Sequence, residues 1–152
     1  MLLVTGITGH SGRFFLDELI KNKYNGNIRC IIRSTSDTKT IDESGLKIEK
    51  VIGDINDVEF LEKCMKDVST VFHIVNIRYS IKIINAAISH DVPRVICVHT
   101  TGIYSRFKMA SDEYKEIDKE IKNMVIGKNI RLTILQPTMI FGDLCDHNMS
   151  KF

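Results

Sequence analysis

Three glycines near the start of the chain, Gly6, Gly9 and Gly12, are spaced G-x-x-G-x-x-G directly after an apolar run. This spacing suits a strand that turns sharply into a helix, so that backbone N–H groups face a pyrophosphate. A Cβ at any of the three positions would obstruct the turn, the ligand or the packing of the helix on the strand. The segment therefore predicts a phosphate-binding loop, and it limits the fold to one that begins with strand, loop and helix.

The residues around the glycines supply the context that the motif requires. Residues 2–4 form a short apolar strand before it, and residues 13–22 carry apolar side chains at helical spacing after it. Residues 25–27 then break the chain before a second apolar strand at 28–32. This is the strand–helix–strand unit in which such a loop binds a dinucleotide.

The same alternation continues along the rest of the chain. Apolar runs predict strands at 46–52, 70–75, 94–98 and 131–135, and helical periodicity predicts helices at 58–65, 80–90 and 111–126. We expect a Rossmann-type α/β fold, with a doubly wound parallel sheet of about six strands and helices on both faces. Residues 34–45 and 101–110 lack a clear period and follow strands, so they should lie at the ligand-binding edge of the sheet. Residues 1–152 should form a single domain.

Composition excludes several other classes of function. The 21 Lys and Arg against 19 Asp and Glu leave a charge of only +2, which predicts neither nucleic acid nor a membrane surface as a partner. No apolar run approaches the roughly twenty residues of a membrane span, and no signal peptide precedes the first strand, so we expect a cytoplasmic protein. The four cysteines form no C-x-x-C pair, and Cys30 and Cys97 read as core residues. His10, His73 and His99 lack ligand spacing, so no metal site is predicted.

With this order laid out, the chain resembles the extended and atypical short-chain dehydrogenase/reductases. That group contains nucleotide-sugar epimerases and dehydratases and the NmrA-like NAD(P)-binding proteins. The resemblance covers residues 1 to about 148 and rests on several segments in the family's order. They are residues 5–12 for TGxxGxxG, 53–55 for GD(I/L), 71–74 for the fourth-strand VFH, 85–87 for the helix behind it, 99–104 for SSxxVYG and 136–142 for RPxxxYG.

The resemblance implies roles for individual residues. It implies that the cofactor is bound by Gly6, Thr8, Gly9, His10, Ser11, Gly12, Asp54, Ile55, Ile74, Val75, Pro137 and Met139. It places Thr100 or Thr101 where the family has its catalytic serine or threonine, and Tyr114 where it has its proton donor. It also implies that the family's C-terminal substrate segment is missing from this sequence.

The acid/base motif of the family is not intact. The family's YxxxK sets tyrosine and lysine about 40° apart on a helix, whereas this chain has Tyr114 followed by Asp118 at that spacing. Lys115 and Lys119 lie at about 100° and 140° from Tyr114, so neither shares its face. The charged run 112–120 itself reads as a solvated helix face, in which Asp118 attracts Lys122. Tyr114 is then either the general acid or a surface tyrosine.

The second strand ends in Arg33 instead of the carboxylate that receives the ribose of NAD. A guanidinium matches phosphate oxygens, so the sequence predicts a preference for NADP, with NAD as the alternative and Lys39 as a further nearby charge. A solvated arginine is the competing interpretation. Thr100 and Thr101 likewise have two interpretations, as donors to a substrate carbonyl or as residues that complete a strand edge.

Two functions fit these observations. The first is a nicotinamide-dependent oxidoreductase or epimerase/dehydratase that acts by hydride transfer on a nucleotide sugar or another small carbonyl or alcohol. The second is an NmrA-like protein that binds NAD(P) as a sensor without turning it over. Relatives often dimerise through the helices that resemble 80–90 and 111–126, so a homodimer is also expected.

Overall fold

The computed structural model describes residues 1–106, 111–138 and 140. Six parallel strands form one sheet in the order β3-β2-β1-β4-β5-β6. The bounds of the strands are β1 Leu2–Thr5, β2 Ile28–Ile32, β3 Ile48–Ile52, β4 Thr70–His73, β5 Arg94–Val98 and β6 Arg131–Leu135. The predicted Rossmann-type doubly wound sheet is confirmed, since the strand order reverses at β1 and leaves a crevice there.

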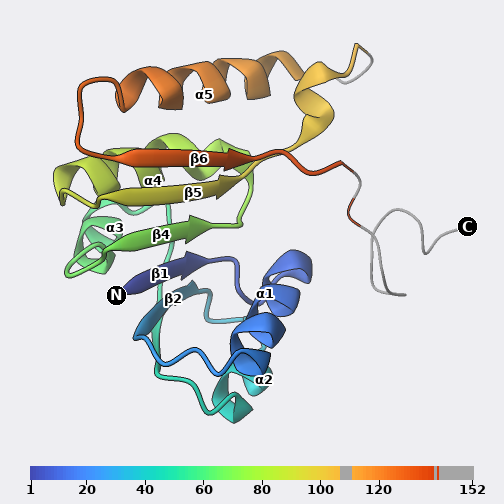
Figure 1. Ribbon diagram of the computed structural model, residues 1–152, viewed down its shortest axis with the longest axis vertical. Helices are drawn as coiled ribbons and strands as arrows, with labels where there is room; N and C mark the ends of the chain where they lie inside the picture. Colours follow the sequence, from blue (N-terminus) through green and yellow to red (C-terminus); the bar gives the residue numbers. More distant parts are fainter. Residues whose placement is uncertain (107–110, 139, 141–152) are drawn as a thin grey trace, which may run out of the picture.

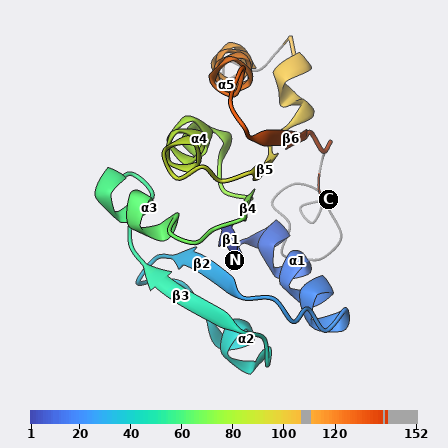
Figure 2. The same cartoon turned by 60° about the vertical axis from the view of Figure 1, so that its left-hand side comes forward.

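Helices cover both faces of the sheet (Figures 1 and 2). Figure 2 shows α1 and α2 on one side, and α3, α4 and α5 on the other. The bounds of the helices are α1 His10–Lys21, α2 Lys39–Glu43, α3 Val58–Cys64, α4 Ser80–Ser89 and α5 Ser111–Met124, with 3-10 turns η1 Ile77–Tyr79 and η2 Thr101–Tyr104. None of the helices in these described ranges is both long and apolar enough to cross a membrane.

Adjacent residues of the central strands pack on opposite faces of the sheet. Leu3 packs in the cluster under α3, α4 and α5, whereas Val4 packs in the cluster under α1 and α2. This follows from the alternation of side chains along a strand, and it explains why the central strands read as continuous apolar runs. Cys30 and Cys97 are buried as predicted, and burial raises the pKa of each thiol to about 12.

Several predicted boundaries are corrected by the structure. Helix α1 begins at His10 instead of residue 13, because the last glycine of the loop already belongs to its first turn. Strand β3 begins at Ile48 instead of 46, and β4 ends at His73 instead of 75. The stretch 34–45 contains the five-residue helix α2, which has only one buried residue, Ile41, and therefore no readable period.

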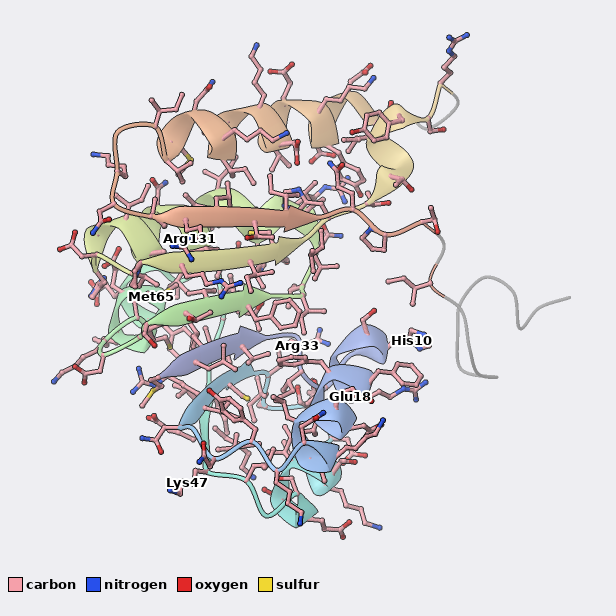
Figure 3. All side chains as sticks on the ribbon, viewed as in Figure 1. His10, Glu18, Arg33, Lys47, Met65 and Arg131 are labelled. Carbon is pink, nitrogen blue, oxygen red and sulfur yellow. The ribbon has the colours of Figure 1, made fainter. Side chains whose placement is uncertain are left out.

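The two ends of the sheet carry different residues (Figure 3). Lys47 and Arg131 lie where β3 and β6 begin, whereas His10 and Arg33 follow the ends of β1 and β2. Because all strands are parallel, the segments after β1 to β6 all start from the same edge. The candidate site lies at that edge.

Candidate functional site

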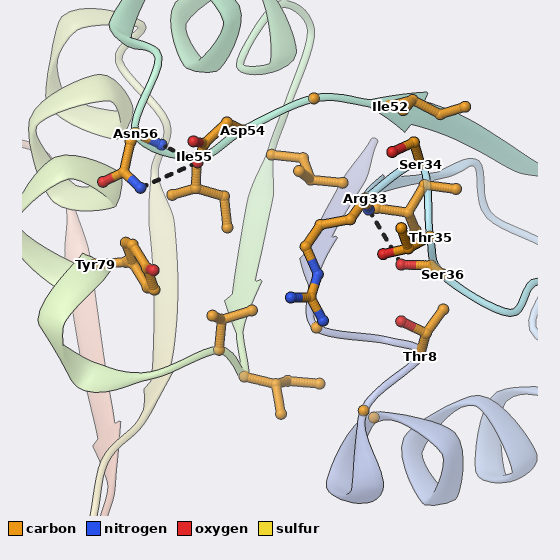
Figure 4. Close-up of a pocket in the computed structure, with 18 of the residues that line it drawn as sticks. Thr8, Arg33, Ser34, Thr35, Ser36, Ile52, Asp54, Ile55, Asn56 and Tyr79 are labelled. Carbon is orange, nitrogen blue, oxygen red and sulfur yellow. Dashed lines mark hydrogen bonds between the residues drawn. The ribbon is translucent and has the colours of Figure 1, made fainter.

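A cavity of about 940 Å³ opens at the carboxyl ends of β1, β2, β3 and β4 (Figure 4). Its position matches the crevice in which open α/β sheets bind ligands. Four segments, one after each of these strands, supply the wall. The lining residues are Gly6, Thr8, Gly9, His10, Ser11, Gly12, Ile31, Ile32, Arg33, Ser34, Thr35, Ser36, Ile52, Gly53, Asp54, Ile55, Asn56, Ile74, Val75 and Tyr79.

The glycine loop forms one side of this cavity, and its geometry explains why glycine is needed. Gly6 has a φ of +78°, and a Cβ there would lie 2.8 Å from the Val75 side chain. A Cβ on Gly12 would lie 2.0 Å from the Gly6 carbonyl oxygen and 2.6 Å from the backbone of Ile7. The first glycine therefore permits the turn, and the third permits the close packing of α1 on the loop.

The start of α1 presents backbone donors to the cavity. Gly9 is the N-cap and supplies no side-chain hydrogen bond to the helix. The first N–H groups of a helix have no intrahelical acceptor, and the helix dipole makes this end electropositive. His10, Ser11 and Gly12 stand in this first turn and line the cavity. The arrangement suits a phosphate.

Arg33 and three hydroxyl residues follow β2. The Arg33 backbone N–H donates to the Ser36 hydroxyl over 3.1 Å, and the Ser36 N–H donates to the Arg33 carbonyl over 3.0 Å. These bonds close a tight turn, from which the Arg33 side chain extends into the cavity beside Thr8 (Figure 4). Its guanidinium has no hydrogen-bond or ion-pair partner within residues 1–106, 111–138 and 140. The Arg33 guanidinium thus lies inside the cavity, whereas Lys39, in α2, does not line it.

Asp54, Asn56 and Tyr79 form the side of the cavity opposite Arg33 (Figure 4). The Asp54 carboxylate accepts from the Asn56 backbone N–H over 2.8 Å and from its side-chain amide over 3.1 Å. Sequence reasoning predicted Asp54 but missed Asn56, Tyr79 and the hydroxyl residues after Arg33. The polar run Ser34–Thr35–Ser36 after a strand was a readable signal, but Tyr79 had none, because its position depends on how η1 turns into α4.

The structure brings together nearly all of the predicted cofactor-binding residues. Each of them lines the cavity except Pro137 and Met139. Pro137 lies after β6, where its carbonyl accepts from the Thr101 N–H over 3.1 Å. Met139 lies outside the described residues.

The predicted catalytic residues do not line this cavity. The Thr100 hydroxyl accepts from the Gly102 N–H over 3.0 Å and so caps η2, while the Thr101 hydroxyl donates to the Pro137 carbonyl over 3.2 Å. Tyr114 is half-buried against the core, and the Arg78 guanidinium lies 5.2 Å from the centre of its ring. Arg78 in turn forms a two-point ion pair with Glu113, at 2.7 and 2.6 Å. The cationic group over the Tyr114 ring is therefore Arg78 of η1. The helical pattern of the sequence could not predict this contact.

The interpretation of 112–120 as a solvated face is wrong at Asp118. This residue is only 4% exposed, and its carboxylate accepts from His99 Nδ1 over 2.9 Å and from Lys122 over 2.5 Å. Since the carboxylate can only accept, His99 donates through Nδ1, and Nε2 accepts from the Ser80 hydroxyl over 2.9 Å. The charge pattern of the helix could not predict this contact, because His99 comes from the segment that follows β5.

Two histidines at the carboxyl ends of β4 and β5, His73 and His99, are buried. Burial lowers the pKa of His99 below its ordinary value, although the hydrogen bond with Asp118 opposes this shift. Burial and then the nearby His99 ring lower the pKa of His73 to about 3, and its Nδ1 lies 2.8 Å from the Thr5 hydroxyl. Both rings are therefore neutral near pH 7. Ser80 is fully buried, so the Ser80–His99–Asp118 array joins α4, the residue that follows β5, and α5 without offering a reachable nucleophile.

The sequence profile of a family described as NAD(P)H-binding matches residues 6–143. The chain belongs to this NAD(P)H-binding family. The predicted nicotinamide dinucleotide-binding domain is thereby confirmed, and a nicotinamide dinucleotide is the cofactor class of the domain. No curated protein matches the sequence significantly.

Several solved structures share the fold at low sequence identity. An NADPH-dependent quinone oxidoreductase from Escherichia coli is 22% identical with a TM-score of 0.69, over 90% of this chain and 47% of that one. Triphenylmethane reductase from Citrobacter sp., complexed with NADP(H), is 21% identical with a TM-score of 0.73, over 91% and 50%. Pen from Bacillus thuringiensis is 18% identical with a TM-score of 0.74, over 89% and 48%. The chain thus spans about half the length of these proteins.

Proposed function

We propose that this chain is the NADP(H)-binding part of an oxidoreductase, and that Arg33 binds the 2′-phosphate of the cofactor. The observation that carries the proposal is the Arg33 guanidinium, which lies inside the cavity beside Thr35 and Ser36 and has no hydrogen-bond or ion-pair partner among the described residues. A guanidinium fork forms two parallel hydrogen bonds with phosphate oxygens. The end of β2 carries no carboxylate to receive the 2′-hydroxyl of NAD instead.

Other segments of the cavity wall would bind the other parts of the cofactor. The uncapped first turn of α1 would hold the pyrophosphate, and the turn at Gly6 would let the backbone approach it closely. The side with Asp54 and Ile55 would hold the adenine, as the family resemblance implies. When bound, the nicotinamide accepts or supplies a hydride, and the chain's own contribution is to bind and orient the dinucleotide.

Equilibrium titration of the protein with NADPH and, separately, with NADH tests this proposal. We expect saturable binding of both, with NADPH bound at least tenfold more tightly, because a charge-assisted contact contributes about 1.5–3 kcal/mol. Equal affinities would contradict the role of Arg33, and binding of neither dinucleotide would contradict the proposed function itself.

For the reaction, we propose hydride transfer to a small carbonyl compound or its reverse from an alcohol, a nucleotide sugar being one such substrate. Support comes from the two similar structures named as NADPH-dependent or NADP(H)-bound reductases. Within this chain Thr100 is the better donor to a substrate oxygen, because its oxygen accepts from Gly102 and its own proton stays available. The Thr101 proton is already donated to Pro137.

A second candidate is cofactor binding without turnover, as in an NmrA-like sensor. It is favoured by the placement of Tyr114 under Arg78 and of Asp118 in a buried hydrogen-bonded array, where the family has its acid/base pair. The Tyr114→Phe variant separates the two. Loss of turnover with unchanged NADPH affinity would support the enzyme, whereas a wild-type protein that binds NADPH and reduces no carbonyl compound would support the sensor.

A further inference from the structure

The 3-10 turn η2 packs beside helix α5 (Figure 1), and a second cavity of about 370 Å³ lies between them. It shares no lining residue with the cofactor cavity at the ends of β1 to β4. Its volume lies within the range of about 300–1,000 Å³ that is typical of small-molecule sites. The lining residues are Ile103, Tyr104, Lys115, Asp118, Lys119, Lys122 and Asn123.

Three lysines line this cavity from one face of α5. Lys115, Lys119 and Lys122 recur at steps of four and three residues, which places their side chains within about 60° of one another around the helix axis. Ammonium groups at these spacings repel each other. The cluster therefore destabilises the free helix slightly, and an anion bound in the cavity would relieve the repulsion.

The one acidic residue in the lining does not compensate this cluster. The Asp118 carboxylate is shared between two donors, His99 Nδ1 at 2.9 Å and the Lys122 ammonium at 2.5 Å. Because the His99 bond occupies one of its oxygens and Lys122 the other, Asp118 has no oxygen left to pair with the remaining lysines. Three ammonium groups and one carboxylate leave the lining with a net charge of +2.

The other two lysines are weakly paired or have no partner. Lys115 lies 3.2 Å from Asp112, whose side chain is 90% exposed, so water screens this pair strongly. Lys119 has no hydrogen-bond or ion-pair partner within residues 1–106, 111–138 and 140. The cavity therefore offers at least one ammonium group that a ligand can engage without breaking a contact of the protein.

The wall opposite the lysines is apolar. Ile103 is buried, and Tyr104 turns its ring to the cavity while its hydroxyl donates to Gln136 Oε1 over 3.2 Å. This bond limits the positions that the ring can take. The methylene groups of the lysine side chains add further apolar surface. A ligand of this cavity thus needs an apolar body as well as a concentrated negative charge.

We propose that the cavity between η2 and α5 is a second binding site, whose ligand is a phosphate monoester with a small apolar group. A phosphate monoester carries a charge of about −1.5 to −2 near pH 7 on one compact group, which matches the net charge of the lining. Lys119 would contact the phosphate, and Ile103 and Tyr104 would cover the apolar group. The inference goes beyond the proposed function, because this site needs no dinucleotide.

Phenyl phosphate is the probe, added to the protein in a ¹H–¹⁵N NMR titration. We expect saturable shifts of the backbone amides of Ile103, Lys119 and Asn123, while Gly9 and Ser36 report separately on the cofactor cavity. Phenyl sulfate has the same shape with one charge, and inorganic phosphate lacks the ring. Each should bind at the lysine cavity at least about threefold more weakly than phenyl phosphate.

Two exposed residues provide the variants, so neither change threatens the fold. Lys119→Gln should weaken phenyl phosphate binding at these amides by about threefold or more. Lys128→Gln is the matched control, because it removes the same charge from an exposed position after α5, outside both cavities. Tyr104→Ala should weaken phenyl phosphate and leave inorganic phosphate unchanged, since it removes the ring that covers the apolar group.

Three results would overturn the inference. The first is the absence of saturable shifts at the lysine cavity, including the case in which Gly9 and Ser36 alone respond. The second is an equal loss of affinity in Lys119→Gln and Lys128→Gln, which would reduce the effect to general attraction by a basic surface. The third is equal affinity for phenyl phosphate, phenyl sulfate and inorganic phosphate, which would exclude the proposed class of ligand.

Discussion

Gly12 is the residue whose replacement the loop tolerates least. A Cβ there would approach the Gly6 carbonyl oxygen to 2.0 Å, and both atoms belong to a backbone that cannot rotate away. We expect Gly12→Ala to lower the free energy of unfolding by about 2–3 kcal/mol, measured by chemical denaturation. Gly9→Ala is the matched control, because its Cβ would lie 3.2 Å from the same oxygen and needs only a small shift. Equal stabilities for the two variants would contradict this description of the loop.

Arg33 carries the predicted choice between the two cofactors. Replacing it with alanine removes the proposed partner of the 2′-phosphate, so Arg33→Ala should weaken NADPH binding by about tenfold to a hundredfold. NADH lacks that phosphate, and its affinity should change by less than about threefold. Arg131→Ala, at the opposite end of the sheet, should change neither affinity. Parallel losses for NADPH and NADH in Arg33→Ala would indicate a general role for the charge instead of phosphate recognition.

At the scale of elements, Asp118 connects α5 to His99, the residue that follows β5. Asp118→Ala leaves a buried His99 N–H and one end of Lys122 without their acceptor, and we expect a loss of about 2–4 kcal/mol in the free energy of unfolding. Asp112→Ala, in the same helix, breaks a pair with Lys115 in which the aspartate is 90% exposed, and it should cost less than about 1 kcal/mol. Similar losses for both would restore the solvated interpretation of Asp118.

The buried histidines between β1, β4, β5 and the helices should make stability sensitive to acid. The pKa of His73 is lowered to about 3 in the folded protein from a usual value near 6.5, so the unfolded chain binds the proton first. The stability that the neutral His73 contributes to the folded state is complete above about pH 6.5. The free energy of unfolding declines as the pH falls from there toward 3, by up to about 1.4 kcal/mol per pH unit. His99, shifted in the same direction, adds to this loss.

His73→Asn tests this account, because asparagine does not titrate and keeps a polar group near Thr5. Its free energy of unfolding, measured by denaturation between about pH 7 and pH 5, should fall less steeply with acid than that of the wild type. Identical slopes for the two proteins would exclude His73 as a source of the acid sensitivity.

For the whole molecule, the sequence predicted the sheet because its signals are local. Apolar runs and glycine spacing are properties of short segments, so six strands and their parallel arrangement could be read before any contact was known. The contents of the cavity were also largely readable, since residues that follow strands in a parallel sheet must meet at one edge. Arg33 and Asp54 were found in this way.

What the sequence could not provide was the pairing of distant side chains. Asp118 is buried by His99, Tyr114 is covered by Arg78, and Asn56 is oriented by Lys82, and in each case the partner comes from another element. Periodicity indicates which face of a helix is apolar, but it does not indicate which polar residue of a neighbouring strand or turn contacts that helix. The same limit explains why Tyr79 was missed.

The most direct test of the central claim is a ¹H–¹⁵N NMR titration of the protein with NADPH, which locates the bound dinucleotide by the backbone amides that shift. We predict saturable shifts at Gly9, Ser36 and Asn56, which lie on three different sides of the cavity. Lys47 and Arg131, at the opposite end of the sheet, should not shift. Shifts confined to that opposite end, or none that saturate, would contradict the proposal that NADP(H) binds at the carboxyl edge of the strands.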